Sequence, residues 1–130
     1  MNLGTLNVDV ITLFVEDLHK TKAFYQEVFQ LAVVYEDEVS AVYNFGNISI
    51  NLLNISEADG LIKPANPAGP ESGSRFQFTI QVENVDEAVR ELEEREVRLL
   101  NGPMNRSWGV RTVTFADPAG HIWELAQQLS

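Results

Sequence analysis

Glu124 has the most unusual setting of the carboxylates in this sequence, because residues 122–125 around it are otherwise apolar. A carboxylate buried without a partner is costly, so Glu124 needs either a neighbouring group or a ligand. In the first case it forms a structural ion pair with an arginine. In the second case it binds a ligand amine or acts as a catalytic base.

Polar side chains alternate with apolar ones along residues 75–82. Gln77 and Thr79 each lie between apolar neighbours, which puts them on one face of a strand and the apolar side chains on the other. Such a polar face either meets solvent or hydrogen-bonds a ligand.

An aromatic and cationic segment surrounds Trp108. Its indole either covers the edge of the core or stacks on a planar ligand. Arg106 and Arg111 flank it, and either guanidinium is able to clamp an anionic group or to form a salt bridge in this acidic chain. His19 and His121, at the start of a helix and of a strand, are expected to be exposed rather than ligating.

Composition excludes several other chemistries. The 130 residues contain no cysteine, which rules out disulfides and thiolate metal sites, and a cytoplasmic location is expected. The net charge of −10 disfavours nucleic acid, because phosphate backbones require basic patches. No apolar run approaches the ~20 residues of a membrane span. No Gly-rich phosphate loop, nucleophile elbow or Ser/Cys–His pair is visible.

Hydrophobic periodicity predicts the elements that hold these side chains. In the first half, strands are expected at residues 8–15, 31–37, 40–45 and 47–54, and a helix at residues 18–29 follows the N-cap Asp17. In the second half, a strand at residues 75–82 precedes a helix that opens at Asp86, and strands at residues 98–100, 111–116 and 121–127 follow. Residues 56–73 contain three prolines and three glycines and are expected to form a loop.

Both halves therefore have the order β-α-β-β-β, and short sequences recur at equivalent points. VEDL before the first helix resembles VENV before the second, and GNI at residues 46–48 resembles GHI at residues 120–122. A duplicated module is the economical interpretation. We predict an α+β fold in which residues 1–130 form one domain, with βαβββ modules at 1–55 and 75–130 and a linker at 56–74. Two curved mixed sheets would enclose a cleft lined by their helix-free faces.

Three segments resemble the glyoxalase/bleomycin resistance protein/dioxygenase (vicinal oxygen chelate) superfamily. They are VEDLHKTKAFYQEVF at residues 15–29, SWGVR at residues 107–111 and FADPAGHIWEL at residues 115–125. The resemblance implies paired βαβββ modules, commonly in a homodimer. In the metalloenzymes of the family it also implies a divalent ion, with ligands from the first and last strand of each module.

The resemblance places the four metal-ligand positions on Val10, Asn51, Gln77 and Glu124. Valine has no donor atom and asparagine is a weak ligand, whereas Gln77 and Glu124 are able to hold an ion. A shift of one residue would replace Val10 by Asp9, but Asp9 would then share a face with the apolar side chains that pack on the helix.

The sequence leaves three hypotheses for function. In the leading one, the protein binds a small organic molecule or antibiotic, needs no cofactor, and uses Thr12, Asn51, Gln77, Thr79, Trp108, Arg111 and Glu124 as its site. The alternative is a metal-dependent glyoxalase-like lyase or isomerase, or an extradiol-type dioxygenase, with a divalent ion on Glu124 and Gln77 and with Glu124 as the catalytic residue. The third is a vestigial or regulatory binding domain.

Overall fold

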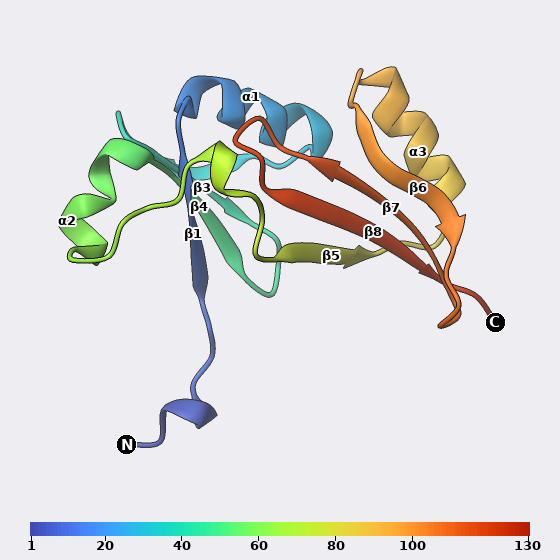
Figure 1. Cartoon of the computed structure of the whole chain (residues 1–130), viewed down its shortest axis with the longest axis horizontal. Helices are drawn as coiled ribbons and strands as arrows, with labels where there is room; N and C mark the ends of the chain where they lie inside the picture. Colours follow the sequence, from blue (N-terminus) through green and yellow to red (C-terminus); the bar gives the residue numbers. More distant parts are fainter. The chain divides into compact units, whose positions relative to one another are not determined.

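The first sheet has the strand order β1-β4-β3-β2. In the computed structural model, which describes residues 1–130, these strands are β1 (Val10–Val15), β2 (Val33–Glu36), β3 (Ser40–Asn44) and β4 (Ser49–Asn54). β1 is parallel to β4, and the other two pairs are antiparallel (Figure 1). A tight turn joins β3 and β4, and Gly46 supplies its positive φ of 98°.

Helix α1 (Leu18–Val28) covers one face of this sheet. It begins where the sequence predicts, because the Asp17 carboxylate accepts a hydrogen bond from the Lys20 N–H at 3.0 Å. Tyr25 of this helix is fully buried against the sheet and stacks on Tyr43 of β3, with ring centroids 5.7 Å apart. The other buried strand residues of this core are Leu13, Val15, Ala41, Ile50 and Leu52.

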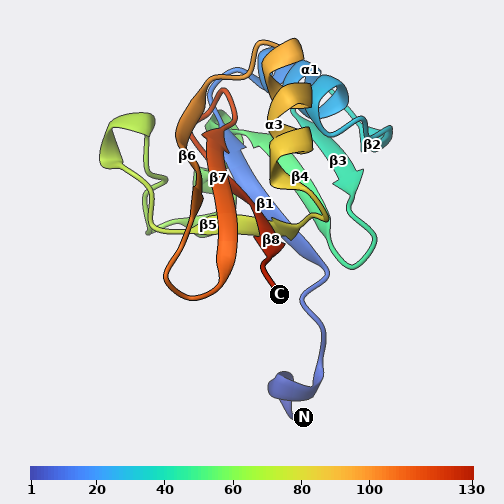
Figure 2. The same ribbon diagram turned by 90° about the vertical axis from the view of Figure 1, so that its right-hand side faces the viewer.

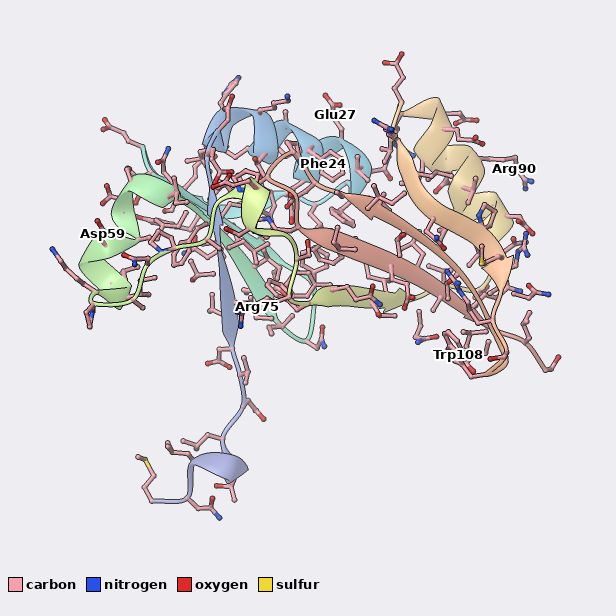
Figure 3. The ribbon with its side chains drawn as sticks, viewed as in Figure 1. Phe24, Glu27, Asp59, Arg75, Arg90 and Trp108 are labelled. Atoms are coloured by element: carbon pink, nitrogen blue, oxygen red, sulfur yellow. The ribbon has the colours of Figure 1, made fainter.

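The second sheet repeats this topology with the order β5-β8-β7-β6. Its strands are β5 (Gln77–Gln81), β6 (Leu99–Asn105), β7 (Val110–Ala116) and β8 (Ile122–Gln128), and β5 is parallel to β8. Helix α3 (Val85–Glu94) lies across one face of this sheet (Figure 2). It buries Val85, Val89 and Leu92, while Arg90 projects away from the sheet (Figure 3). The predicted α+β fold of two βαβββ modules is confirmed.

The chain divides into two compact units, Met1–Ala68 and Gly69–Ser130. The segment between the sheets is more ordered than the predicted loop, because it contains the short helices η2 (Ile55–Glu57), α2 (Asp59–Ile62) and η3 (Pro70–Ser72). A further short helix, η1 (Leu3–Thr5), precedes β1. None of the helices combines the length and apolarity that a bilayer crossing needs.

Several boundaries in the second module differ from the predicted ones, and the differences at α3 and β6 have a clear physical reason. Helix α3 begins at Val85 rather than at Asp86, because the Asn84 side chain accepts a hydrogen bond from the Glu87 N–H at 3.0 Å. Strand β6 is longer than the predicted residues 98–100. Two register shifts against β7 accommodate the residues around Gly102, and pairing continues to residue 105.

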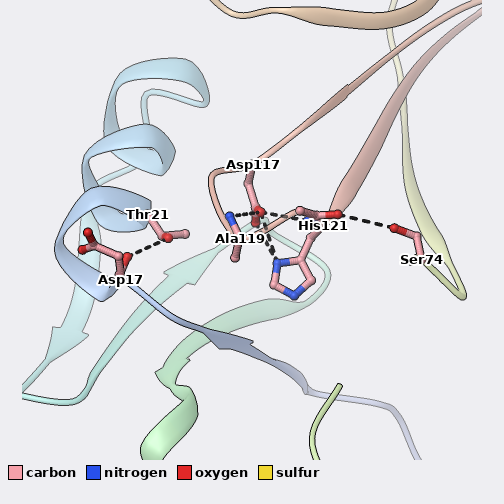
Figure 4. Close-up of polar contacts among 7 residues, drawn as sticks. Asp17, Thr21, Ser74, Asp117, Ala119 and His121 are labelled. Carbon is pink, nitrogen blue, oxygen red and sulfur yellow. Dashed lines mark hydrogen bonds and ion pairs between the residues drawn. The ribbon is translucent and has the colours of Figure 1, made fainter. Parts of the chain in front are cut away.

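The turn between β7 and β8 is held by the buried carboxylate of Asp117 (Figure 4). Its Oδ1 accepts hydrogen bonds from two backbone N–H groups of the turn, both at 2.9 Å. Its Oδ2 lies 3.0 Å from Nδ1 of His121, whose side chain is only 17% exposed, so the predicted exposure of this histidine is wrong. These contacts fix the start of β8, the strand that carries Glu124.

We expect Asp117→Ala to lower the free energy of unfolding by about 2–4 kcal/mol, because two backbone donors and His121 lose a buried partner. Urea unfolding followed by circular dichroism measures this loss. Asp59→Ala, at an exposed aspartate of α2, is the control and should change stability by less than about 1 kcal/mol. Equal losses in the two variants would contradict the role given to Asp117.

Gly102 and Gly109 offer a matched pair of substitutions in the β6–β7 hairpin. Both have positive φ, 89° and 87°, but a Cβ at Gly102 would lie 2.4 Å from the Thr112 carbonyl oxygen, whereas a Cβ at Gly109 would meet open space. Gly109→Ala should cost about 1–2 kcal/mol of unfolding free energy from backbone strain alone. Gly102→Ala should cost clearly more, about 3 kcal/mol, because the sheet backbone must move. Thermal and urea unfolding would refute the close approach if the two losses were the same.

Candidate ligand-binding face

The helix-free face of each sheet carries a hydrogen-bonded pair of polar side chains at an equivalent position. In the first sheet, Asn51 of β4 donates from Nδ2 to Thr12 Oγ1 of β1 at 3.4 Å. In the second sheet, Thr79 of β5 donates from Oγ1 to Glu124 Oε1 of β8 at 2.9 Å. Each pair joins the first and last strand of its module, two residues after the pairings Val10–Ser49 and Gln77–Ile122. The two pairs therefore occupy equivalent positions in the duplicated modules.

The strands beyond each pair extend these rows differently. Asn51 is followed across the first sheet by Val42 and Tyr35. Glu124 is followed across the second sheet by Thr114 and Asn101. Registered neighbours on adjacent strands lie on the same face, so the second sheet presents a continuous polar row and the first a mixed one.

Glu124 is half-buried, and its partner is a hydroxyl rather than the arginine that the sequence left open. None of the salt bridges in the chain involves it. An ionised carboxylate has about four lone-pair sites, so the single bond from Thr79 leaves capacity for further donors. Glu124 is thus placed to accept a hydrogen bond from a ligand N–H or O–H group.

Asn51 has the same kind of free capacity in the first module. Its Oδ1 atom is buried and has no hydrogen-bond partner in the chain. Leaving a buried acceptor unpaired costs about 1–3 kcal/mol, which a ligand donor would offset. Asn51 and Glu124, at the two equivalent positions, thus each carry an acceptor oxygen with unused lone pairs.

Arg111 does not join this face. Its Nη2 lies 2.9 Å from the Asp86 carboxylate at the start of α3, and its Nη1 donates to Asn105 at 3.0 Å. Its strand neighbour Gln127 also contacts this helix, accepting a hydrogen bond from the Val85 N–H at 2.9 Å. Arg111 is therefore on the helix-covered face, and its proposed role in ligand binding is corrected to a contact between sheet and helix.

Arg106 is the arginine that reaches the helix-free face. Its Nε donates to Thr112 Oγ1 at 2.9 Å and its Nη2 to Asn101 Oδ1 at 2.5 Å. Side chains alternate between the two faces along β7, so Arg111 shares a face with the buried Val113, whereas Thr112 lies on the opposite face. Arg106 differs from Arg111 because it bonds to Thr112. Trp108 lies at the end of the same hairpin and is 70% exposed, so it does not cover the core (Figure 3).

Tyr35, at the edge of the first sheet, is held as a hydrogen-bond donor. Its hydroxyl donates to Asp37 Oδ2 at 3.0 Å, and this bond raises the pKa of Tyr35 above its ordinary value. The pKa of Asp37 is lowered, chiefly by the backbone N–H of Val39 and further by the hydroxyls of Ser40 and Tyr35. Tyr35 therefore stays protonated at neutral pH and does not act as a base.

One hollow lies elsewhere, beside the start of α3. It has a volume of about 510 Å³ and is lined by Val82, Glu83, Asn84, Glu87, Ala88 and Glu91. Glu87 and Glu91 are one helical turn apart, so their like charges repel each other and favour solvation. This hollow has the character of a solvated helix surface.

The duplicated topology agrees with comparisons to known proteins. Residues 7–125 match the Glyoxalase/Bleomycin resistance protein/Dioxygenase superfamily. The chain belongs to this superfamily. It is 31% identical over 135 residues to the mitochondrial methylmalonyl-CoA epimerase of Bos taurus, covering 97% of this chain and 75% of the epimerase.

Solved structures share this fold. A glyoxalase/bleomycin resistance protein/dioxygenase from Nocardioides superposes with a TM-score of 0.86 at 19% identity, covering 99% of this chain and 87% of that one. TnmS3, an antibiotic binding protein from Streptomyces, superposes with a TM-score of 0.72 at 23% identity, covering 98% and 99% of the two chains. At these identities the likeness concerns the fold.

The four positions to which the sequence resemblance assigns the metal ligands carry few donors. Val10 lies on the helix-free face, 49% exposed, and has no donor atom. Gln77 is exposed and pairs with Ile122, so it lies diagonally from Glu124, at about 7–8 Å between backbones. Asp9 precedes β1 and does not replace Val10 within the strand.

The remaining side chains do not complete a metal site. No three His, Cys, Asp or Glu side chains lie together in an arrangement that could hold a metal ion. One carboxylate and two neutral amides, from Glu124, Gln77 and Asn51, do not match the imidazole and carboxylate sets that hold catalytic divalent ions. The residues present thus do not fit the metal that the superfamily implies.

The contact between Arg111 and Asp86 predicts a measurable coupling between the two residues. Arg111→Gln, Asp86→Asn and the double variant form a thermodynamic cycle, and we expect a coupling of about 0.5–1 kcal/mol because both side chains are partly exposed. Urea unfolding at low and high salt measures it, and salt should reduce it. A coupling of zero at low salt would argue against the assignment of Arg111 to the helix-covered face.

Proposed function

We propose that this superfamily member binds a small organic molecule against the helix-free faces of its sheets without a catalytic divalent ion. The observation that carries the proposal is Val10. This residue lies on the helix-free face of β1, where a side chain that coordinates a metal ion would have to be, and its side chain offers only methyl groups. A binding function needs no ion, because enclosure by apolar surface and a few placed polar groups suffices for specific affinity.

The matched polar pairs supply those placed groups. Thr12 with Asn51, and Thr79 with Glu124, are joined by hydrogen bonds that restrict their rotamers before a ligand arrives. Side chains fixed in advance lose less entropy on binding. The acceptor oxygens of Asn51 and Glu124 favour a ligand that carries N–H or O–H donors.

Sequestration of an antibiotic or another organic compound is the form of binding that we favour. It requires affinity and no chemical step, which agrees with a face that has a single carboxylate. The fold is shared with TnmS3, which is an antibiotic binding protein. The resemblance supports the class of activity and leaves the identity of the compound to experiment.

A metal-dependent enzyme is the second candidate, favoured by the similarity to methylmalonyl-CoA epimerase. In that case Glu124 and Gln77 would hold a divalent ion, and the protein would be a glyoxalase-like lyase or isomerase or an extradiol-type dioxygenase. Val10 and the neutral amide of Asn51 weigh against it.

We also propose that the protein acts as a homodimer in the cytoplasm. The homodimer is the assembly that the superfamily resemblance implies. The absence of cysteine agrees with a reducing compartment, where disulfides do not form.

Metal content and ligand response together test the proposal. Protein purified without chelator should contain divalent metal well below one equivalent, and Mn²⁺, Ni²⁺ or Zn²⁺ should not raise its Tm. A thermal-shift screen of antibiotics and metabolites should find compounds that raise Tm. At a concentration of 100 Kd, such a compound raises the free energy of unfolding by about 2.7 kcal/mol. Glu124→Gln should weaken the effect of these compounds, because the amide replaces one acceptor oxygen by a donor.

Glu91→Gln is the matched control, since it removes the same charge from an exposed position of α3. It should leave the response to the compounds unchanged. One equivalent of divalent ion that is lost in Glu124→Gln would refute the metal-free site and favour the enzyme. A complete screen without a stabilising compound would instead favour a vestigial or regulatory domain.

A further inference from the structure

Arg106 is held by hydrogen bonds at the start of the turn of the β6–β7 hairpin. Its backbone N–H donates to the Val110 carbonyl at 2.7 Å, and its own carbonyl accepts the Gly109 N–H at 3.2 Å. Its side chain is half-buried and bonded through Nε and Nη2 to Thr112 and Asn101. The guanidinium is therefore fixed over the helix-free face of the second sheet.

The two bonds use only one edge of the guanidinium. Nε and Nη2 form the side edge, which the acceptors Thr112 and Asn101 occupy. Both N–H groups of Nη1 and the second N–H of Nη2 remain, and one N–H from each of these two nitrogens forms the end fork that matches a carboxylate or phosphate bidentately. The protein orients this fork and leaves it without an acceptor of its own.

The charge of Arg106 is also not cancelled. Both of its partners are neutral, and none of the salt bridges in the chain involves it. This is unexpected in a chain with 19 acidic and 9 basic side chains, where carboxylates are abundant. A half-buried guanidinium fixed by neutral acceptors attracts an anionic group from outside the chain.

The same face brings this cation near Glu124. Asn101, Thr114 and Glu124 occupy one row across β6, β7 and β8. Adjacent strands are about 4.8 Å apart, so the backbone of Asn101, the partner of Arg106, lies roughly 10 Å from that of Glu124. The spacing suits a compact organic molecule with different groups at its two ends.

We propose that Arg106 is the anion-binding residue of this face and that the ligand is an organic acid. The carboxylate or phosphate of the ligand would bind the end fork of Arg106, and an N–H or O–H donor elsewhere on the ligand would bind Glu124. This inference rests on the proposed function, since it assumes that the helix-free face holds the ligand. It adds the chemical class, which the polar pairs alone do not define.

The test uses three small probes of similar size: benzoate, phenyl phosphate and benzamide. Each is titrated at constant ionic strength into the ¹⁵N-labelled full chain, and the Arg106 Nε–Hε signal and the backbone amides are followed by NMR. We expect the anionic probes to shift the signals of Arg106, Thr112 and Thr114, and benzamide to leave the Arg106 signal unchanged. The tighter of the two anions identifies carboxylate or phosphate as the natural group.

Variants separate the fork from the general charge of the protein. Arg106→Gln should weaken the binding of the anionic probes about tenfold or more, the loss of one bidentate charged contact. Arg106→Lys, which keeps the charge and loses the fork, should give an intermediate loss and covers the case in which the glutamine variant fails to fold. Arg90→Gln removes the same charge from the exposed side of α3 and should have no effect.

The outcomes distinguish this inference from the proposed function. If anionic and neutral probes bind the helix-free face equally well and Arg106→Gln changes neither, the role of Arg106 is wrong and the binding face stands. If no probe shifts any residue of either helix-free face, both ideas fail. If the anions bind and Arg90→Gln weakens them as much as Arg106→Gln, general electrostatics explains the binding and the specific site is overturned.

Discussion

The alternation of side chains along a strand is the constraint on which the rest of this structure depends. Each sheet has one helix, and the helix takes the apolar set of side chains from one face. The other set, two residues apart along every strand, must then face away from the helix. Val10 and Thr12 of β1, and Gln77 and Thr79 of β5, lie on the open faces for this reason.

Parallel pairing between the first and last strand of each module converts this alternation into a site. The registers of β1 with β4 and of β5 with β8 place a threonine beside a longer polar side chain in both modules. The duplicated positions have since diverged, because one module has a neutral amide at Asn51 and the other has a carboxylate at Glu124. Val10 of the first module is apolar, whereas Gln77 at the equivalent position of the second module is polar, so the second module carries most of the polar side chains.

Local patterns in the sequence predict most of the fold. The helical spacing after Asp17 and the strict alternation at residues 75–82 depend on near neighbours, and the structure confirms α1, its cap and the strand β5. Strand β6 was predicted too short, because a β-bulge depends on how the partner strand accommodates Gly102, which the local sequence does not record.

The site was harder to predict for a related reason. Thr79 and Glu124 are separated by 45 residues, so their hydrogen bond depends on a pairing between distant strands. The partner of His121 is Asp117, four residues away, yet the burial of this pair depends on the turn around it. Arg106 and Arg111 have the same chemistry and flank the same tryptophan, but Arg106 bonds to Thr112 on the helix-free face and Arg111 bonds to Asp86 at the start of α3.

We propose that this face recognises a ligand through the oriented acceptors Asn51 and Glu124 and the oriented cation Arg106, without a catalytic metal ion. A titration with Mn²⁺, followed by NMR relaxation of the backbone amides, tests this account most directly, because Mn²⁺ broadens the signals of nearby residues. We predict weak, unselective broadening over the acidic surface, with no preference for Gln77, Thr79 or Glu124 at one equivalent. Selective loss of these signals at one equivalent would demonstrate a metal site and contradict the account.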